Sequence, residues 1–172
     1  MPQYFAIIGD HDRPLYEAEF TQGPQGFVQE IKELNPFILH ASLDIVEDLQ
    51  WQQNAGTGVA GGAGNSFLRS RNNANTDNCY LGKVDHFYGL VVTAYLTYGG
   101  KKFVMLHGSS VPGGNKTTTT TIDDSMVRSF YQEVHELYIK TIMNPFYQEG
   151  DELRSPLFDT RVKALAKKYL GK

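Results

Sequence analysis

The feature that constrains the fold most is a pair of apolar segments joined by two glycines. Residues 90–97 and 102–107 are rich in Val, Leu and aromatic side chains, and Gly99-Gly100 lies between them. Two adjacent glycines favour the tight turn with positive φ angles that connects the strands of a β-hairpin. The sequence therefore predicts two neighbouring antiparallel strands in this part of the chain.

Periodicity predicts the remaining elements. Residues 4–8, 15–20 and 80–84 have the composition and alternation of strands. Helices are expected over residues 36–50, 123–142 and 156–170, and their N-caps are Asn35, Asp123 or Asp124, and Ser155. The helical spacing of Phe27, Ile31 and Leu34 leaves open a short helical lead-in before Asn35. The order strand, strand, helix, three strands, two helices predicts an α+β fold of three layers. We expect a five-stranded antiparallel sheet with one helix on one face and two on the other.

The first predicted helix has an apolar face that is broader than one sheet needs. The centre of this face is expected to be formed by Ile38, Ala41, Ile45 and Leu49, with Phe37, Leu39 and Val46 on its flanks. Leu43 is expected beyond the edge of the face, beside the polar residues His40, Asp44 and Glu47. These four residues are either an ordinary exposed surface with one tolerated leucine or a strip that docks a partner.

Two segments are predicted to be disordered insertions in one domain that spans residues 1–172. Residues 52–79 contain five glycines and six asparagines, and residues 108–121 contain five consecutive threonines. Segments with so few bulky side chains bury too little apolar surface to repay the entropy of ordering. Cys79, the single cysteine, lies at the end of the first segment and is expected to be inert.

Charge and hydropathy exclude several classes of protein. Sixteen Lys and Arg side chains against 19 Asp and Glu give a net charge of −3, which argues against a nucleic-acid binder. No apolar run approaches the roughly 18 residues that a membrane span requires. Because the first residues also lack a basic leader, we expect a cytoplasmic protein.

Few residues carry a chemical motif. Asp10-His11-Asp12 has the residue types of a metal site, but all three lie in one expected turn, where aspartates are common for local hydrogen bonds. Residues 113–117 resemble a phosphate-binding loop only faintly, because Asn115 occupies the position that requires glycine. We therefore assign no catalytic, cofactor-binding or metal-binding residue. A small hydrolase built around Asp10, His11 and Asp12 remains the alternative from another class.

Several segments together resemble those of one known protein family. Residues 4–14 and 40–46 are similar to the opening strand and turn of the sedlin family and to part of its first helix. The strongest similarity lies in residues 137–140 and in Met-Asn-Pro-Phe-Tyr at residues 143–147. The tail also matches, at Phe158-Asp159, Val162 and Lys167-Lys168. The similar segments occur in the same order and cover nearly everything outside the two predicted insertions.

The resemblance implies a longin-like (profilin-like) fold and a non-enzymatic adaptor that uses no cofactor. Sedlins are small subunits of the TRAPP vesicle-tethering complex, which acts in ER-to-Golgi and Golgi transport. The implied partners are other small core subunits, a large form-specific subunit and, indirectly, the Rab GTPase on which other subunits catalyse nucleotide exchange. The implied location is cytoplasmic, at ER–Golgi and Golgi membranes, with peripheral membrane contact only through the complex.

One residue of the predicted docking strip is also implied by the resemblance. Asp44 matches a functionally important helix aspartate of the sedlin family, which is linked to attachment of the larger partners. His40, Leu43 and Glu47 extend the strip from helical geometry alone. A different longin-type module, such as the regulatory domain of a SNARE or a small chain of an adaptor complex, is the alternative within the same architecture.

Overall fold

The computed structural model describes residues 1–21, 26–27, 29–55, 79–87, 89–108 and 122–171. The strands are β1 (Gln3–Ile8), β2 (Pro14–Phe20), β3 (Tyr80–Phe87), β4 (Leu90–Leu96) and β5 (Lys102–His107). The helices are α1 (Gln29–Ala55), α2 (Asp124–Ile142) and α3 (Pro156–Leu170), and a short 3-10 turn, η1, covers Asp10–Asp12. Every predicted strand and helix is therefore present in the order expected.

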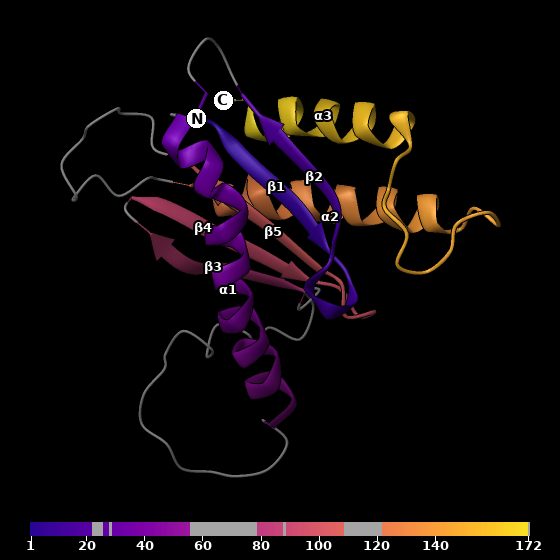
Figure 1. Ribbon diagram of the computed structural model, residues 1–172, viewed down its shortest axis with the longest axis horizontal. Helices are drawn as coiled ribbons and strands as arrows, with labels where there is room; N and C mark the ends of the chain where they lie inside the picture. Colours follow the sequence, from indigo (N-terminus) through magenta and orange to yellow (C-terminus); the bar gives the residue numbers. More distant parts are fainter. Residues whose placement is uncertain (22–25, 28, 56–78, 88, 109–121, 172) are drawn as a thin grey trace.

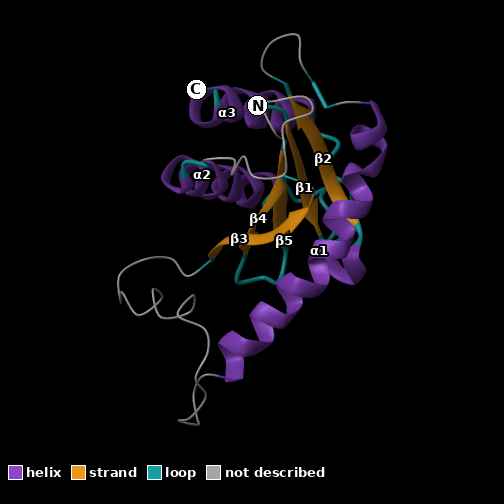
Figure 2. Ribbon diagram, turned by 90° about the vertical axis from the view of Figure 1, so that its left-hand side faces the viewer, coloured by secondary structure: helices purple, strands orange, loops and turns teal. Residues whose placement is uncertain are grey.

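The five strands form one antiparallel sheet in the order β2-β1-β5-β4-β3. Helix α1 crosses one face of the sheet, and α2 and α3 cover the other face (Figures 1 and 2). The expected α+β arrangement of three layers is confirmed, and it is consistent with a longin-like fold. The sheet leaves two edges, β2 and β3.

Each face of the sheet buries its own apolar core. Under α1 the core is aliphatic, and its members include Ala6, Ile8, Leu39, Val46, Val92, Val104 and Leu106. Under α2 and α3 the core is rich in aromatic rings, among them Phe5, Phe20, Tyr95, Phe103, Phe130, Tyr131 and Phe158. Both faces of the central strands are thus covered, which is why β4 and β5 are buried along almost their whole length.

The two C-terminal helices begin where their capping residues predict. The side chain of Asp123 accepts hydrogen bonds from the main-chain N–H groups of Ser125 and Met126, and Ser155 caps Phe158 in the same way. Pro156 occupies the first turn of α3, where its missing N–H costs nothing. Helix α2 buries one side against the sheet, formed by Val127, Phe130, Tyr131, Val134, Leu137 and Tyr138.

Helix α1 begins earlier than predicted. Asn35 is not an N-cap, because the helix already starts at Gln29 and continues through Pro36. Ile31 packs against the aliphatic core, so tertiary burial holds the preceding turns in place although a proline interrupts the helical hydrogen bonds. Pro36 itself lies on the exposed side of the helix.

The predicted limits of both insertions also need correction. Residues 52–55 are helical rather than loop, because α1 continues to Ala55. Cys79 is buried, and its carbonyl accepts a hydrogen bond from Leu96 N–H at 2.7 Å. Gly108 is buried beside Pro2. Residues 56–78 and 109–121, where the remainder of the predicted disorder falls, lie outside the described residues. None of the described helices is long and apolar enough to span a bilayer.

Candidate partner-binding surface

The predicted docking strip lies on α1, but one of its four members points into the protein. His40, Asp44 and Glu47 are exposed. Leu43 is only 3% exposed and belongs to the aliphatic core between α1 and the sheet. The prediction that Leu43 forms part of an exposed strip is therefore wrong.

Leu43 was predicted on the wrong side of α1 because two polar residues occupy the buried side of this helix. Asn35 and Ser42, seven residues apart and so on nearly the same line of the helix, are both fully buried. Ser42 can be buried because its hydroxyl donates a hydrogen bond to the carbonyl of Leu39 at 2.7 Å. The buried side of α1 is therefore centred on polar residues. A prediction based on the spacing of apolar residues places such polar residues on the surface.

Because α1 is turned about its axis relative to the predicted orientation, several of its apolar side chains are in contact with solvent. Phe37 is 72% exposed, and Leu34, Ala41 and Ile45 are exposed as well. Phe37 and Asp44 are seven residues apart, or about two turns, so they lie on the same outward side. We define the α1 outer surface as Leu34, Phe37, His40, Ala41, Asp44, Ile45, Glu47 and Asp48, all of which are exposed.

The α1 outer surface combines apolar and acidic groups in the manner of a protein interface. A large exposed aromatic side chain beside charged residues is typical of a contact that buries an anchor and uses charge for orientation. Asp44, Glu47 and Asp48 supply three carboxylates within two helical turns. Such a surface favours a partner that presents an apolar pocket with basic residues around it.

Glu47 connects α1 to the sheet through a partly buried ion pair with Lys102. The Lys102 ammonium lies 3.4 Å from Glu47 Oε1 and 2.9 Å from Asp12 Oδ1, while the Lys102 side chain is only 8% exposed. One cation at the start of β5 therefore contacts the β1–β2 turn and the middle of α1 together. This contact fixes α1 relative to the sheet, and Asp44 lies one turn before Glu47 on the same helix.

The turn at Asp10–Asp12 makes its ion pairs with lysines on either side of the sheet. Lys101 Nζ lies 2.6 Å from Asp10 Oδ2, and its hydrogen bond lowers the pKa of the Asp10 carboxyl below the ordinary value. Lys102 holds Asp12, as described above. His11 and Asp12 adopt positive φ angles of 56° and 54°.

Both carboxylates of this turn are thus paired with lysine ammonium groups. Within the residues that the structure describes, no group of three or more His, Cys, Asp or Glu side chains is placed to hold a metal. The turn is therefore best explained as an electrostatic anchor for β5 and α1. This arrangement gives no support to the hydrolase alternative.

Comparison with known proteins identifies the family. The family model described as sedlin matches residues 7–168, which is most of the chain. The chain belongs to the sedlin family. It is 63% identical to trafficking protein particle complex subunit 20 of Saccharomyces cerevisiae, with 100% of both chains covered.

More distant relatives also match along their whole length. The transport protein particle 20 kDa subunit of Schizosaccharomyces pombe is 34% identical, covering 99% of this chain and 100% of the relative. The probable trafficking protein particle complex subunit 2 of Caenorhabditis elegans is 32% identical, with 98% and 96% covered. The sedlin resemblance seen in the separate sequence segments is therefore confirmed for the chain as a whole.

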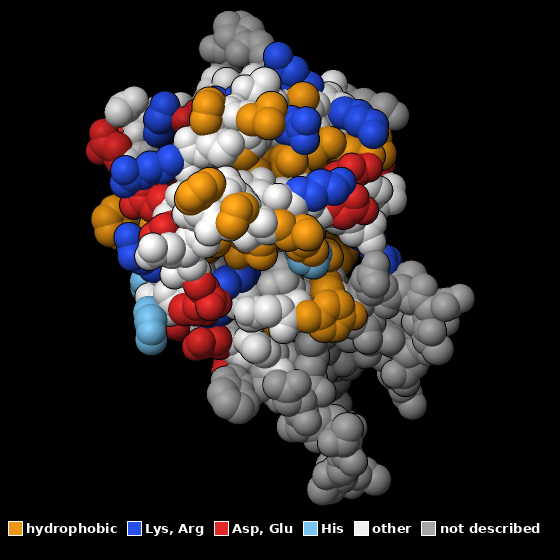
Figure 3. All heavy atoms as spheres, turned by 90° about the vertical axis from the view of Figure 1, so that its right-hand side faces the viewer, with side chains coloured by type: hydrophobic (Ala, Val, Ile, Leu, Met, Phe, Trp, Pro, Cys, Tyr) orange, Lys and Arg blue, Asp and Glu red, His pale blue; other side chains and the backbone are white. Residues whose placement is uncertain are grey.

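The sedlin segment at residues 143–147 forms an ordered, exposed turn at the end of α2. Asn144 Oδ1 accepts a hydrogen bond from Phe146 N–H at 3.1 Å, an Asx turn that directs the Phe146 ring outward. Phe146 is 91% exposed, and Met143 is exposed beside it. Figure 3 shows hydrophobic side chains at the surface of this end of the molecule, between charged ones. Met143 and Phe146 make up a second exposed apolar region, separate from the α1 outer surface.

The structure contains a buried polar cluster of Thr93, His107 and Tyr131 that the sequence did not predict. Thr93 Oγ1 lies 2.9 Å from His107 Nε2 and 2.9 Å from the Tyr131 hydroxyl, and that hydroxyl also donates to the Thr93 carbonyl at 2.8 Å. Burial lowers the pKa of His107 to about 4, so the imidazole is neutral near pH 7. The three residues come from β4, β5 and α2, and no local pattern relates them.

Proposed function

We propose that this chain is a subunit of a trafficking protein particle complex and acts in vesicle transport. The observation that carries the proposal is the 63% identity, over the full length of both chains, to a protein named as a subunit of that complex. Relatives that share about a third of their residues carry names of the same kind.

The chain acts in the complex as an adaptor. It contributes binding surfaces that join small core subunits to a large subunit, and the chemistry of nucleotide exchange on a Rab GTPase belongs to other subunits. The chain reaches ER–Golgi and Golgi membranes from the cytoplasmic side as part of this assembly. Its three layers of packed secondary structure support this role, because a rigid scaffold keeps separate surfaces at a constant distance.

The α1 outer surface binds the large subunit in this proposal. Phe37 is the apolar anchor, and Asp44 is the charged contact that orients the partner. Support comes from the exposure of both side chains on one side of a helix whose other side is buried in the core. His40 and Glu47 flank Asp44 one turn away on each side, which places them at the rim of the same contact.

Native mass spectrometry of the tagged protein, purified gently from its own cells, tests the proposed assembly. We expect a complex that contains several small subunits of similar size and one much larger subunit. A second preparation that carries Asp44→Tyr should retain the small subunits and lose the large one. A bare monomer, under conditions that preserve other tethering complexes, would contradict the adaptor function.

A further inference from the structure

The two edges of the sheet differ in their regularity. Along β3 the pairing with β4 is irregular at two places, and Gly82 has a φ angle of 76°. Irregularities of this kind prevent the addition of another strand. Along β2 the register with β1 is continuous from Tyr16 to Phe20. The β2 edge is therefore the one whose geometry suits a further strand.

Main-chain hydrogen bonds reveal which residues of β2 face away from the sheet. The N–H of Gly108 donates to the carbonyl of Pro2 at 2.8 Å and continues the β1–β5 pairing, so Pro2 faces β5 and, by alternation, the main-chain groups of Gln3, Phe5 and Ile7 face β2. The partners of these three residues on β2 are Phe20, Ala18 and Tyr16, so the main-chain groups of Glu17 and Glu19 face the open edge. The N–H of Leu153 donates to the carbonyl of Leu15 at 2.8 Å, at the register shift where the regular pairing of β2 ends. In the described part of the chain, β2 has no strand neighbour on that side.

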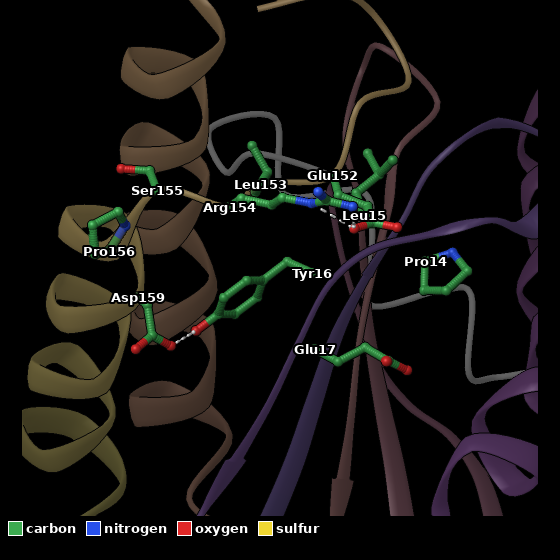
Figure 4. A pocket seen from close by; sticks show the side chains of 10 residues that line it. All are labelled: Pro14, Leu15, Tyr16, Glu17, Glu152, Leu153, Arg154, Ser155, Pro156 and Asp159. Atoms are coloured by element: carbon green, nitrogen blue, oxygen red, sulfur yellow. Dashed lines mark hydrogen bonds and ion pairs between the residues drawn. The ribbon is translucent and has the colours of Figure 1, made fainter.

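An open groove of about 550 Å³ runs along this edge (Figure 4). Its walls are residues 14–17 of β2, residues 152–156 of the segment before α3, and Asp159. This volume lies within the range of protein ligand sites, which is about 300–1,000 Å³. The contact of Leu153 closes the groove at Leu15 and leaves Glu17 open, so an added strand would begin its pairing at Glu17.

The charges of the groove are compensated except at Glu17. Arg154 Nη2 lies 2.9 Å from Glu152, and Lys163 Nζ lies 2.7 Å from Asp159. Within the described residues, Glu17 receives a hydrogen bond from the neutral Tyr4 hydroxyl at 2.7 Å and has no ion pair. A ligand with a cationic side chain at this point would complete the set of charges.

We propose that the β2 edge is a docking site for an extended peptide segment of a partner protein. The segment adds a strand beside Glu17 and Glu19 through main-chain hydrogen bonds and places a lysine or arginine against the Glu17 carboxylate. Main-chain pairing supplies affinity, and alternate side chains of the peptide supply specificity. The site lies on an edge of the sheet, apart from the α1 outer surface, and does not depend on the function proposed for that surface.

Differential peptide selection tests this proposal. The full-length protein and its Glu17→Pro variant are each presented to a displayed library of random ten-residue peptides. Proline removes the outward N–H of Glu17 and is tolerated at an edge position of this kind. We expect the wild-type protein to enrich alternating β-branched sequences with one conserved lysine or arginine, and their affinity to fall at least tenfold for Glu17→Pro.

A second variant keeps the test decisive if Glu17→Pro fails to fold. Glu17→Gln retains the main chain and removes the charge, so it should weaken the selected peptides several-fold. The amide hydrogens of Glu17 and Glu19 in the wild-type protein should exchange more slowly when peptide is bound. Asp44→Tyr, on the α1 outer surface, is the matched control and should leave peptide affinity unchanged.

Three results would overturn the proposal. The first is the enrichment of no sequence above background on the wild-type protein. The second is a selected peptide that leaves the exchange of the Glu17 and Glu19 amides unchanged. The third is a peptide whose affinity depends on Asp44 instead of Glu17, which would place the binding on α1.

Discussion

Leu43 and Asp44 are neighbours in the chain, yet Leu43 is buried against the sheet while Asp44 is exposed to solvent. Adjacent residues of a helix point about 100° apart, so the boundary between core and surface passes between them. Changes at these two positions should therefore act on different properties of the protein. We expect Leu43 to contribute to folding stability, and we propose that Asp44 contributes to partner binding.

Substitution of Leu43 should destabilise the fold far more than substitution of its exposed neighbour Ile45. Leu43→Ala leaves a cavity in the aliphatic core and should reduce the free energy of unfolding by about 2–4 kcal/mol. Ile45→Ala, at a side chain that is 37% exposed, should cost less than about 1.5 kcal/mol. Urea denaturation of both variants measures the difference. Equal losses would mean that α1 is rotated relative to the orientation described here.

Stability should fall as the pH is lowered from about 6.5 to about 4, because of His107. The folded protein keeps this imidazole neutral, with a pKa of about 4, whereas in the unfolded chain it binds a proton below its ordinary value of 6.5. The unfolded state therefore binds more protons in this interval, and the free energy of unfolding decreases by up to about 3 kcal/mol. The loss levels off once the pH is below the folded pKa.

Chemical denaturation at a series of pH values measures this contribution. Carboxylates such as Asp10, whose pKa is lowered by Lys101, also lose their stabilising effect in acid, so a matched variant is required. His107→Gln retains a group that can hydrogen-bond to Thr93 and removes the titration. It should give a flatter profile between pH 6.5 and 4 than the wild type. If the wild type and His107→Gln gave parallel profiles of stability against pH, the difference in the pKa of His107 between the folded and unfolded states would be contradicted.

Phe37 should matter for binding and not for folding. Because its side chain is 72% exposed, Phe37→Ser should change the free energy of unfolding by less than about 0.5 kcal/mol. Loss of an aromatic anchor at an interface typically costs about 2 kcal/mol or more, so binding of the large subunit should weaken about thirtyfold. Phe146→Ser, at the other exposed apolar region, serves as the control. Equal effects of the two variants would contradict the assignment of the anchor to α1.

Secondary structure was largely predictable because the signals for it are local. The glycine pair at residues 99–100, the N-cap at Asp123 and the Ser155-Pro156 start of α3 each act within a few residues. Local signals left the start of α1 open. Asn35 and Pro36 have the residue types of a helix start, whereas the spacing of Phe27, Ile31 and Leu34 allowed an earlier one, and packing of the partly buried Ile31 against the core favours the earlier start.

The candidate surface was only partly predictable because it depends on tertiary contacts. Asp44 and Glu47 are exposed as expected, since charged side chains avoid burial without partners. Leu43 was predicted at the surface and is buried, whereas Phe37 was predicted on the buried side and is exposed, because Ser42 and Asn35 occupy the buried side of the helix. The Lys102 contact with Asp12 and Glu47, and the cluster of Thr93, His107 and Tyr131, unite distant segments and leave no pattern in the sequence.

We propose that Asp44 on the α1 outer surface binds the large subunit. The most direct measurement is the affinity of the small-subunit assembly for the purified large subunit, with wild-type chain, Asp44→Tyr and Glu136→Tyr. Glu136 is an exposed acid on α2 whose pair with Lys140 is long, at 3.6 Å, so its variant controls for a surface tyrosine.

We expect at least a tenfold loss of affinity for Asp44→Tyr, equivalent to about 1.4 kcal/mol, and a loss of less than about twofold for Glu136→Tyr. Both variants should retain the wild-type melting temperature, because neither side chain is buried. Wild-type affinity for a folded Asp44→Tyr variant would contradict the proposed role of Asp44 in binding the large subunit.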